Sequence, residues 1–260
     1  MPYKTVLYSE SQGITTITLN RPDKRNAISY QLIDDLMTAL NQAAAAAPNI
    51  VILTGAGSAF SAGMDLENLK NLIGSSDEQN LKDSQTMAGL FRTLYDCPKV
   101  TIAAVNGAAL AGGTALATLC DFTLAVPEAK FGYTEVRIGF VPGIVSSYLI
   151  FNVGEKRARD LLLTGRLFAA QEAHELGLVN EIVAPDQLMA RAHELARQLM
   201  EISPASLQRT KALLSSFTKD QLDRQLRGAI RENAAIRQTE DFKEGVTSFL
   251  EKRKPKWTTT

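Results

Sequence analysis

The first half of the chain alternates short apolar stretches with polar turns. β-Branched and apolar residues fill positions 4–9 and 14–19 on either side of Ser11-Gln12-Gly13, which predicts a β-hairpin. After Ser29, apolar residues recur at helical spacing, which predicts a helix with Ser29 as its N-cap and Pro48 as its stop. The chain therefore begins with a hairpin followed by an amphipathic helix.

Further along, strands, Gly-rich turns and helices follow one another without a linker. We expect strands at 50–53, 100–105, 122–126 and 129–131, a Gly-rich loop at 54–63, and helical structure up to about residue 97 and from residue 143 onward. Leu222, Leu226, Ile230 and Asn233 share one face of a late, more polar helix. This order predicts an α/β fold, with a core at 1–195 and a C-terminal helical region at 196–260.

The charge balance excludes some function classes. Lys and Arg together number 28, as do Asp and Glu, so the net charge is zero and the basic surface of a nucleic-acid binder is not expected. The two cysteines, Cys97 and Cys120, lie in apolar settings, which favours free thiols in a reducing compartment. The N-terminal residues carry no export signal. We therefore expect a cytoplasmic protein.

Positions 101–120 carry no charge and meet the crude length rule for a membrane span. The window nevertheless contains Asn106, Gly107, Gly112 and Gly113, and the rest is mostly Ala or Thr, so it would insert poorly. A buried strand, turn and helix fits these residues better, and we expect no membrane segment.

The residue types available for chemistry are few. Neither Gly-rich turn ends in the Gly-Lys-Ser/Thr of a phosphate loop, and no serine stands in a G-x-S-x-G elbow. His174 and His193 have no Cys or His at metal-ligand spacing, so no metal is expected. The turns can instead expose main-chain N–H groups. Gly112 or Gly113 at the start of a helix could hold a developing negative charge, although a tight structural turn explains the same residues.

Several segments, in order, resemble the crotonase family, the enoyl-CoA hydratase/isomerase superfamily. They are LNRPDKRNA at 19–27, AFSAGMDL at 59–66, AVNGAALAGG at 104–113, FGYTE at 131–135, GFVPG at 139–143 and AHELGLVN at 173–180. The resemblance implies a crotonase-type spiral of β-β-α units with a C-terminal helical trimerisation region. It also implies a homotrimer or dimer of trimers, an acyl-CoA substrate, and no cofactor beyond the coenzyme A that the substrate carries.

The resemblance assigns roles to individual residues. The backbone N–H groups of Met64 and Gly112 would form an oxyanion hole for the thioester, and each donor of this kind is typically worth about 2.7–4 kcal/mol. The coenzyme A arm would lie along Lys24, Arg25, Ala62, Met64, Asp65 and Leu66, and its nucleotide end would approach Phe249 and Lys252.

One position departs from the two-glutamate hydratases of this family. Ala115 stands where those enzymes place their first glutamate, and Glu135 occupies the second position. Hydration shares its proton transfers naturally between two carboxylates, whereas a double-bond shift needs only one acid/base. We therefore expect Glu135 to act alone, with its pKa raised by Val136, Ile138, Phe140 and Val141 around it.

The reaction itself stays open at this point. Isomerisation of a 3-enoyl-CoA to a 2-enoyl-CoA is slightly favoured. Hydration is the alternative, with Glu135 in both roles or with help from Thr114 or from the carboxylate of a branched dicarboxylic substrate such as a methylglutaconyl-CoA. A non-catalytic or RNA-binding homologue is the alternative from another class.

Overall fold

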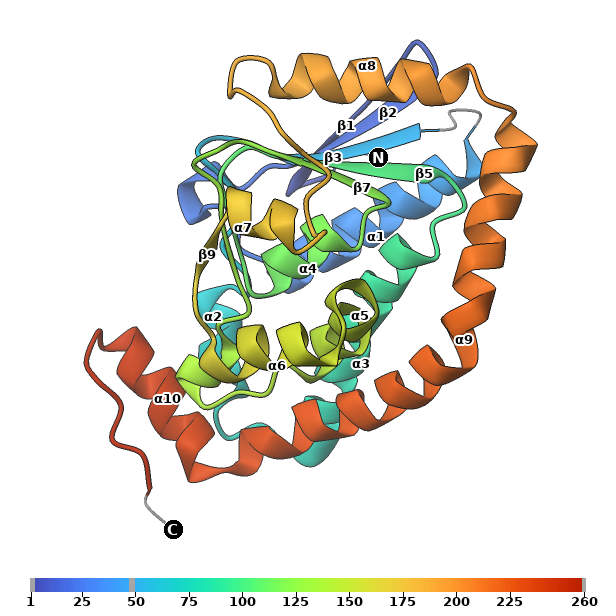
Figure 1. Ribbon diagram of the computed structural model, residues 1–260. Coiled ribbons are helices and arrows are strands. Elements are labelled where there is room, and N and C mark those ends of the chain that lie inside the picture. Colours follow the sequence, from blue (N-terminus) through green and yellow to red (C-terminus); the bar gives the residue numbers. More distant parts are fainter. Residues whose placement is uncertain (1–2, 47–49, 259–260) are drawn as a thin grey trace.

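The computed structural model describes residues 3–46 and 50–258 (Figure 1). β1 (Val6–Ser11) and β2 (Ile14–Leu19) pair in antiparallel register from Val6 opposite Leu19 to Ser11 opposite Ile14, which confirms the predicted hairpin. Helix α1 (Tyr30–Ala45) follows, and the side chain of Ser29 accepts a hydrogen bond from the Leu32 N–H, as expected of an N-cap. Pro48, the expected stop of this helix, lies outside the described residues.

The larger sheet has six strands in the order β1-β2-β3-β5-β7-β10. Its remaining members are β3 (Ile50–Gly55), β5 (Val100–Val105), β7 (Phe122–Ala125) and β10 (Glu181–Ile182). Every pair after the hairpin is parallel. β5 is buried along its whole length and β3 along nearly all of it, because helices cover both faces of the sheet, and this is why both strands are continuous apolar runs.

A second sheet of four short strands, in the order β4-β6-β8-β9, was only partly predicted. It consists of β4 (Ala59–Ser61), β6 (Ala108–Leu110), β8 (Lys130–Gly132) and β9 (Phe168–Ala169). β4 and β6 lie inside the two Gly-rich turns, where three small residues give no strand signal. From β3 to β8 the strands alternate between the two sheets, one strand in each before the next helical segment, which confirms the expected α/β spiral of β-β-α units.

The helices surround the sheets, and a long one closes the molecule along one side (Figure 1). They are α2 (Leu66–Leu72), α3 (Asp77–Tyr95), α4 (Gly112–Thr118), α5 (Gly143–Val153), α6 (Glu155–Thr164), α7 (Ala170–Glu175), α8 (Leu188–Met200), α9 (Pro204–Ala235) and α10 (Glu240–Leu250), with short 3-10 turns η1 (Pro22–Lys24), η2 (Glu135–Ile138) and η3 (Ile236–Gln238). The single helical stretch expected before residue 97 is two helices, because Ser76 caps α3 in a reciprocal bond with Gln79.

The late helices differ in what they cover. α8 packs on β3 and β5, and the expected boundary between residues 195 and 196 falls inside it. α9 packs on α3 and α5 through the expected face, since Leu222, Leu226 and Asn233 are buried. Within the described ranges, no helix is both long enough and apolar enough to span a bilayer. Residues 101–120 form β5, β6 and α4, as predicted.

Candidate active site

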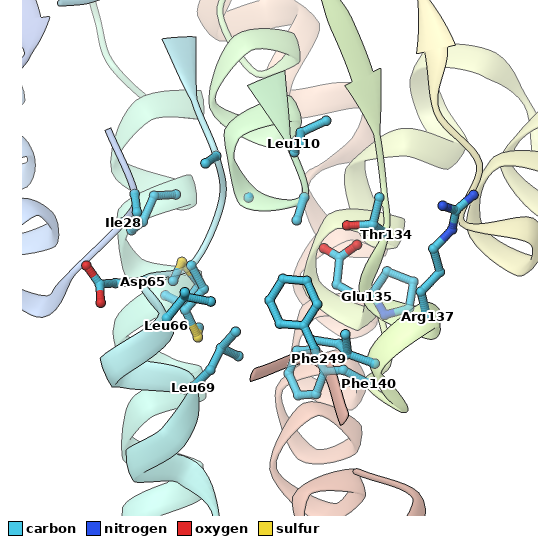
Figure 2. A pocket seen from close by; sticks show the side chains of 18 of the residues that line it. Ile28, Asp65, Leu66, Leu69, Leu110, Thr134, Glu135, Arg137, Phe140 and Phe249 are labelled. Carbon is cyan, nitrogen blue, oxygen red and sulfur yellow. The ribbon is translucent and has the colours of Figure 1, made fainter. Parts of the chain in front are cut away.

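A cavity of about 800 Å³ opens between η1, α2, α3, α4, η2, α5, α9, η3 and α10. Figure 2 shows Asp65, Leu66 and Leu69 on one wall, and Thr134, Glu135 and Arg137 on the opposite wall. The sequence-predicted site residues that line it are Lys24, Arg25, Ala62, Met64, Asp65, Leu66, Gly112, Glu135 and Phe249. Lys252 does not line the cavity, whereas its neighbour Arg253 does. The structure thus brings together all but one of the expected residues.

The pairing of β4 with β6 brings the two Gly-rich turns into contact. Ala59 and Ser61 pair with Ala108 and Ala109 in parallel, so the residues after each strand leave the sheet side by side. A Cβ on Gly63 would lie 2.8 Å from the Leu110 carbonyl oxygen, and one on Gly113 would lie 2.4 Å from the Ser61 carbonyl oxygen. Only glycine allows this approach at both positions.

Two amides at this contact are left without partners. The N–H groups of Met64 and Gly112 donate to no acceptor in the described residues, although the amides of Asp65 and Ala111 next to them are bonded to Ile28 and Gly132. Gly112 is the first residue of α4, where an N–H has no partner within the helix. Two free donors beside one cavity could hold an oxygen on which negative charge develops.

The backbone before Gly112 is in an unusual conformation. Ala111 has φ +49° and ψ −119°, although a residue with a Cβ rarely adopts positive φ. The Ala111 N–H donates to the Gly132 carbonyl at 2.7 Å, which helps to hold the turn. Strain of this kind is found where a neighbouring group must be aimed at a ligand.

The turn that carries Lys24 and Arg25 is fixed by the fully buried Asn26. The Asn26 side chain accepts from the Arg21 N–H at 2.8 Å and donates to the Ala56 and Ala59 carbonyls at 2.9 and 2.8 Å. Arg25 and Asn26 both have positive φ, so this turn folds back on itself. The exposed Lys24 and Arg25 therefore stand at the rim of the cavity on a rigid support.

The Asp65 side chain has a structural role. One carboxylate oxygen pairs with Arg21 at 2.7 Å, and the other accepts from the Glu67 N–H at the start of α2 at 2.9 Å. Arg21 also bonds the Ala27 carbonyl. Asp65 thus links the turn after β2 to the start of α2. It lines the cavity, but Arg21 neutralises its charge.

Glu135, at the start of η2, is the carboxylate available for chemistry. Its Oε2 is shielded from solvent and accepts no hydrogen bond within the described part of the chain. Burial raises the pKa of Glu135 from 4.5 to about 7, and its own backbone N–H offsets part of that rise. Ile138, Phe140 and Val141 line the same cavity, as expected of apolar neighbours, whereas Val136 does not line it and packs toward Gly165. A glutamate with a pKa near neutrality can both take up and release a proton.

A buried alanine stands at the position of the first glutamate of the two-glutamate hydratases. Ala115 is buried, with 3% of its surface exposed. The suggestion that Thr114 positions water is wrong, because its hydroxyl donates to the Ala109 carbonyl at 2.6 Å and accepts from the Gly132 N–H at 3.1 Å. Thr114 is fully buried and does not line the cavity.

The remaining candidate groups lie away from the cavity. His174 and His193 each place Nδ1 against a backbone carbonyl, of Val179 and Met189 respectively. Cys97 and Cys120 are free and buried, as predicted. Among residues 3–46 and 50–258, no three His, Cys, Asp or Glu side chains gather where they could hold a metal ion.

Three arginines and one asparagine line the cavity although none of them was named as a site residue from the sequence: Arg137, Asn233, Arg237 and Arg253. Asn233 was recognised only as part of a helix face. The others lie in segments where charged residues are common, and only tertiary packing shows which of them reach the cavity.

The fold is a spiral of β-β-α units. Its cavity presents the free amides of Met64 and Gly112 together with Glu135, a carboxyl of raised pKa, and this combination defines an enzyme site for a carbonyl substrate. A family model described as enoyl-CoA hydratase/isomerase matches residues 9–260. The putative enoyl-CoA hydratase of Thermus thermophilus is 44% identical over 250 residues, which are 95% of this chain and 98% of that protein. The probable enoyl-CoA hydratase of Rhizobium meliloti is 36% identical over 98% of both chains.

A solved structure agrees with these relatives. The crystal structure of an enoyl-CoA hydratase/isomerase from Xanthobacter autotrophicus Py2 matches with a TM-score of 0.90 and 33% identity, over 96% of this chain and 94% of that chain. The protein therefore belongs to the enoyl-CoA hydratase/isomerase family, and it is an enzyme of the crotonase fold.

Proposed function

We propose that this enzyme shifts the double bond of a 3-enoyl-CoA to give the 2-enoyl-CoA, with Glu135 as its single acid/base. The ionised Glu135 removes a proton from C2, and the electrons move through C3 to the thioester oxygen to form a dienolate. The N–H groups of Met64 and Gly112 stabilise that oxygen. Glu135 then returns the proton to C4, so the substrate and product have the same atoms and no metal or redox cofactor is required.

The observation that carries this proposal is the isolation of the Glu135 carboxyl. Four acidic residues line the cavity: Asp23, Asp65, Glu67 and Glu135. Asp65 is bonded on both oxygens, and Asp23 and Glu67 are exposed to solvent. Glu135 alone among them combines a shielded, unbonded oxygen with a pKa near neutrality. Such a group is tuned for proton transfer.

Hydration of a 2-enoyl-CoA is the second candidate, because the relatives above are named as hydratases. In that reaction Glu135 would take a proton from water as the oxygen attacks C3, and would then deliver a proton to C2. The same two amides would hold the enolate. Ala115 weighs against this route, since no second carboxylate stands at that position to share the work.

We infer that the coenzyme A arm lies against the Lys24-Arg25 rim and extends toward Phe249, where Arg253 rather than Lys252 faces the cavity. A homotrimer or dimer of trimers remains our expectation. It is supported by exposed apolar side chains on α9, with Leu213, Leu214 and Phe217 exposed by 56%, 60% and 71%. A reducing, cytoplasmic compartment is likewise expected from the two free thiols.

A non-catalytic or RNA-binding role fits the site less well. An unbonded buried carboxyl destabilises the fold, and such groups gather at catalytic sites. Two free amides facing one buried carboxyl of raised pKa have no purpose in a binding module.

The test is turnover of 3-hexenoyl-CoA and 2-hexenoyl-CoA by the wild-type enzyme and by Glu135→Gln. An isomerase produces the conjugated absorbance of the 2-enoyl thioester without first forming a 3-hydroxy product, whereas a hydratase consumes it. We expect isomerisation by the wild type and a loss of at least 100-fold in the variant. If both reactions survive the substitution within tenfold, Glu135 is not the acid/base.

A further inference from the structure

We propose that Gly245, in α10, is a positioning residue for Glu135. Because Gly245 has no side chain, the backbone of α10 lies directly against η2, and this contact fixes where η2 holds the Glu135 carboxyl relative to the Met64 and Gly112 amides. The inference rests on the proposed function, since it concerns the group that acts there as the acid/base.

Glycine is an unfavourable residue at this place in the helix. Gly245 lies in the middle of α10 and is buried. A glycine inside a helix lowers stability relative to alanine, because it loses more conformational freedom on folding. Its presence here is explained by a contact that a larger residue would not allow.

That contact is with the backbone at the end of η2. A Cβ on Gly245 would lie 2.3 Å from the carbonyl carbon and oxygen of Ile138, and 2.8 Å from the Gly139 nitrogen. All three are backbone atoms, so no change of side-chain rotamer could relieve the overlap. Ordinary contact begins near 3.4 Å, so alanine at this position would push the two segments apart by about 1 Å.

A second glycine makes the matching contact from the side of η2. Gly139, which ends η2, has φ +66°, and a Cβ on it would lie 2.3 Å from the Asp241 carbonyl oxygen. Asp241 precedes Gly245 by one helical turn, so the two backbones touch at two points along α10. The contact therefore fixes the orientation of η2 as well as its distance from the helix.

Glu135 is linked to this contact through a single turn. It is the first residue of η2, and its carbonyl accepts from the Phe140 N–H at 3.0 Å. The Phe140 ring in turn lies against the Phe242 ring of α10, with the ring centres 5.6 Å apart. A shift of Ile138 and Gly139 would therefore be passed on to Glu135.

α10 also packs on the opposite wall of the cavity. Side chains of α10, of α2 and of the residue after Gly139 form an apolar cluster separate from the main core: Phe242, Val246, Leu69, Leu72 and Phe140. α2 begins two residues after Met64, which carries one of the free amides. Figure 2 shows Phe249 of α10 between Leu69 and Glu135. The helix thus lies between the segments that hold the amide and the carboxyl, and it sets the distance between them.

The test is the Gly245→Ala variant, assayed with 3-hexenoyl-CoA. A misplacement of a reacting group by about 1 Å can lower a rate about 100-fold. We expect kcat to fall 30- to 100-fold, while the dissociation constant of the unreactive hexanoyl-CoA changes less than threefold. Calorimetric titration with hexanoyl-CoA also counts the folded sites, so that unfolded protein does not lower the apparent kcat. An unchanged kcat, or a loss accompanied by equally weakened binding, would overturn the proposal.

Gly228→Ala is the matched control. It also replaces a glycine inside a helix, but a Cβ at this exposed position of α9 would meet no atom within 4 Å. Both kcat and the binding of hexanoyl-CoA should stay within twofold of the wild type. A loss like that of Gly245→Ala would mean that any added methyl group in a late helix has this effect, and would contradict the proposal.

Phe242→Leu tests the same contact without adding an atom to it, and it serves also if Gly245→Ala does not fold. The smaller side chain stays apolar but loses the ring contact with Phe140. We expect kcat per folded site to fall three- to tenfold and hexanoyl-CoA binding to stay within threefold. An unchanged kcat would show that α10 does not hold η2 in place.

A double variant separates positioning from general damage. When Glu135→Gln is already present, Gly245→Ala should lower the residual rate less than threefold, because the displaced group can no longer transfer a proton. A loss of the same size in both backgrounds would mean that Gly245 acts on another part of the site, and would contradict the proposal.

Crystal structures of the wild type and Gly245→Ala measure the position of Glu135 without any activity. We expect the Glu135 carboxyl to move by about 1 Å relative to α4. A movement below about 0.5 Å, which a catalytic site tolerates, would overturn the inference. If the carboxyl moves but Glu135→Gln keeps its activity, the proposed function fails and the positioning role stands. If Glu135→Gln is inactive while Gly245→Ala leaves the carboxyl and the rate unchanged, only the positioning role fails.

Discussion

The raised pKa of Glu135 has a measurable effect on folding. The isosteric Glu135→Gln replacement keeps the size and shape of the side chain but removes its ionisation. The wild-type protein must place a carboxylate in the apolar cavity wall at high pH, whereas the variant never does. The two proteins should therefore differ in how their free energies of unfolding change with pH.

The size and sign follow from the two pKa values. Below pH 4.5 the carboxyl is protonated in both the folded and the unfolded protein, and its ionisation costs nothing. Between pH 4.5 and about 7 the unfolded chain ionises while the folded one stays protonated, so the wild type loses stability as the pH rises. At 1.36 kcal/mol per pKa unit, the full difference at pH 8 is about 3 kcal/mol.

The assay is urea unfolding of wild type and variant at pH 4.5, 6 and 8, at one protein concentration because assembly also stabilises the fold. The stability of the variant relative to the wild type should rise by about 3 kcal/mol from the lowest to the highest pH. Glu128→Gln, at an exposed position outside the cavity, provides the control and should follow the wild type. A difference that is flat across this range would refute the buried-carboxyl assignment.

Three further substitutions test the backbone of the site. Gly112→Pro removes one free N–H at a helix position that tolerates proline. Its kcat should be about 100-fold lower than that of the control Gly112→Ala, which adds a Cβ but keeps the donor. Equal kcat values for the two variants in steady-state kinetics would exclude this amide from catalysis. Gly113→Ala places a Cβ 2.4 Å from the Ser61 carbonyl oxygen, and should lower stability in urea by about 2 kcal/mol; an unchanged midpoint would show that the turns can separate. Asn26→Ala removes three hydrogen bonds of a buried side chain and should lower stability by about 3 kcal/mol. A loss below about 0.5 kcal/mol would show that this side chain does not fix the first turn.

Five of the six strands of the larger sheet could be predicted, because they are unambiguous in the sequence, whereas the two-residue β10 could not. β3 and β5 are runs of apolar residues that end in Gly-rich turns, and the Ser29 cap marks the start of α1. β4 and β6 could not be predicted, since three small residues gain their strand conformation only from pairing with each other. These are the strands that bring the Met64 and Gly112 amides together.

The residues of the site also divide into those that the sequence predicts and those that only the packing of the helices shows. Glu135 and the two turns were found because their neighbours resemble family motifs, and the structure places them around one cavity. Asn233 and Arg237 could not be found, because they reach the cavity only through the packing of α9 on α3. Their partners are distant in the chain: Arg237 bonds Asp83, and Asn233 bonds Gly143. Helical spacing predicts a buried face but not what that face contacts.

The central claim is that Glu135 moves the proton at C2, whichever product follows. The most direct measurement is the rate at which 3-hexenoyl-CoA loses its C2 protons in D₂O, followed by proton NMR, since exchange and isomerisation both begin with that step. We predict rapid loss with the wild-type enzyme and a rate at least 100-fold lower with Glu135→Gln. Loss of the C2 protons by the variant within tenfold of the wild-type rate would contradict the account.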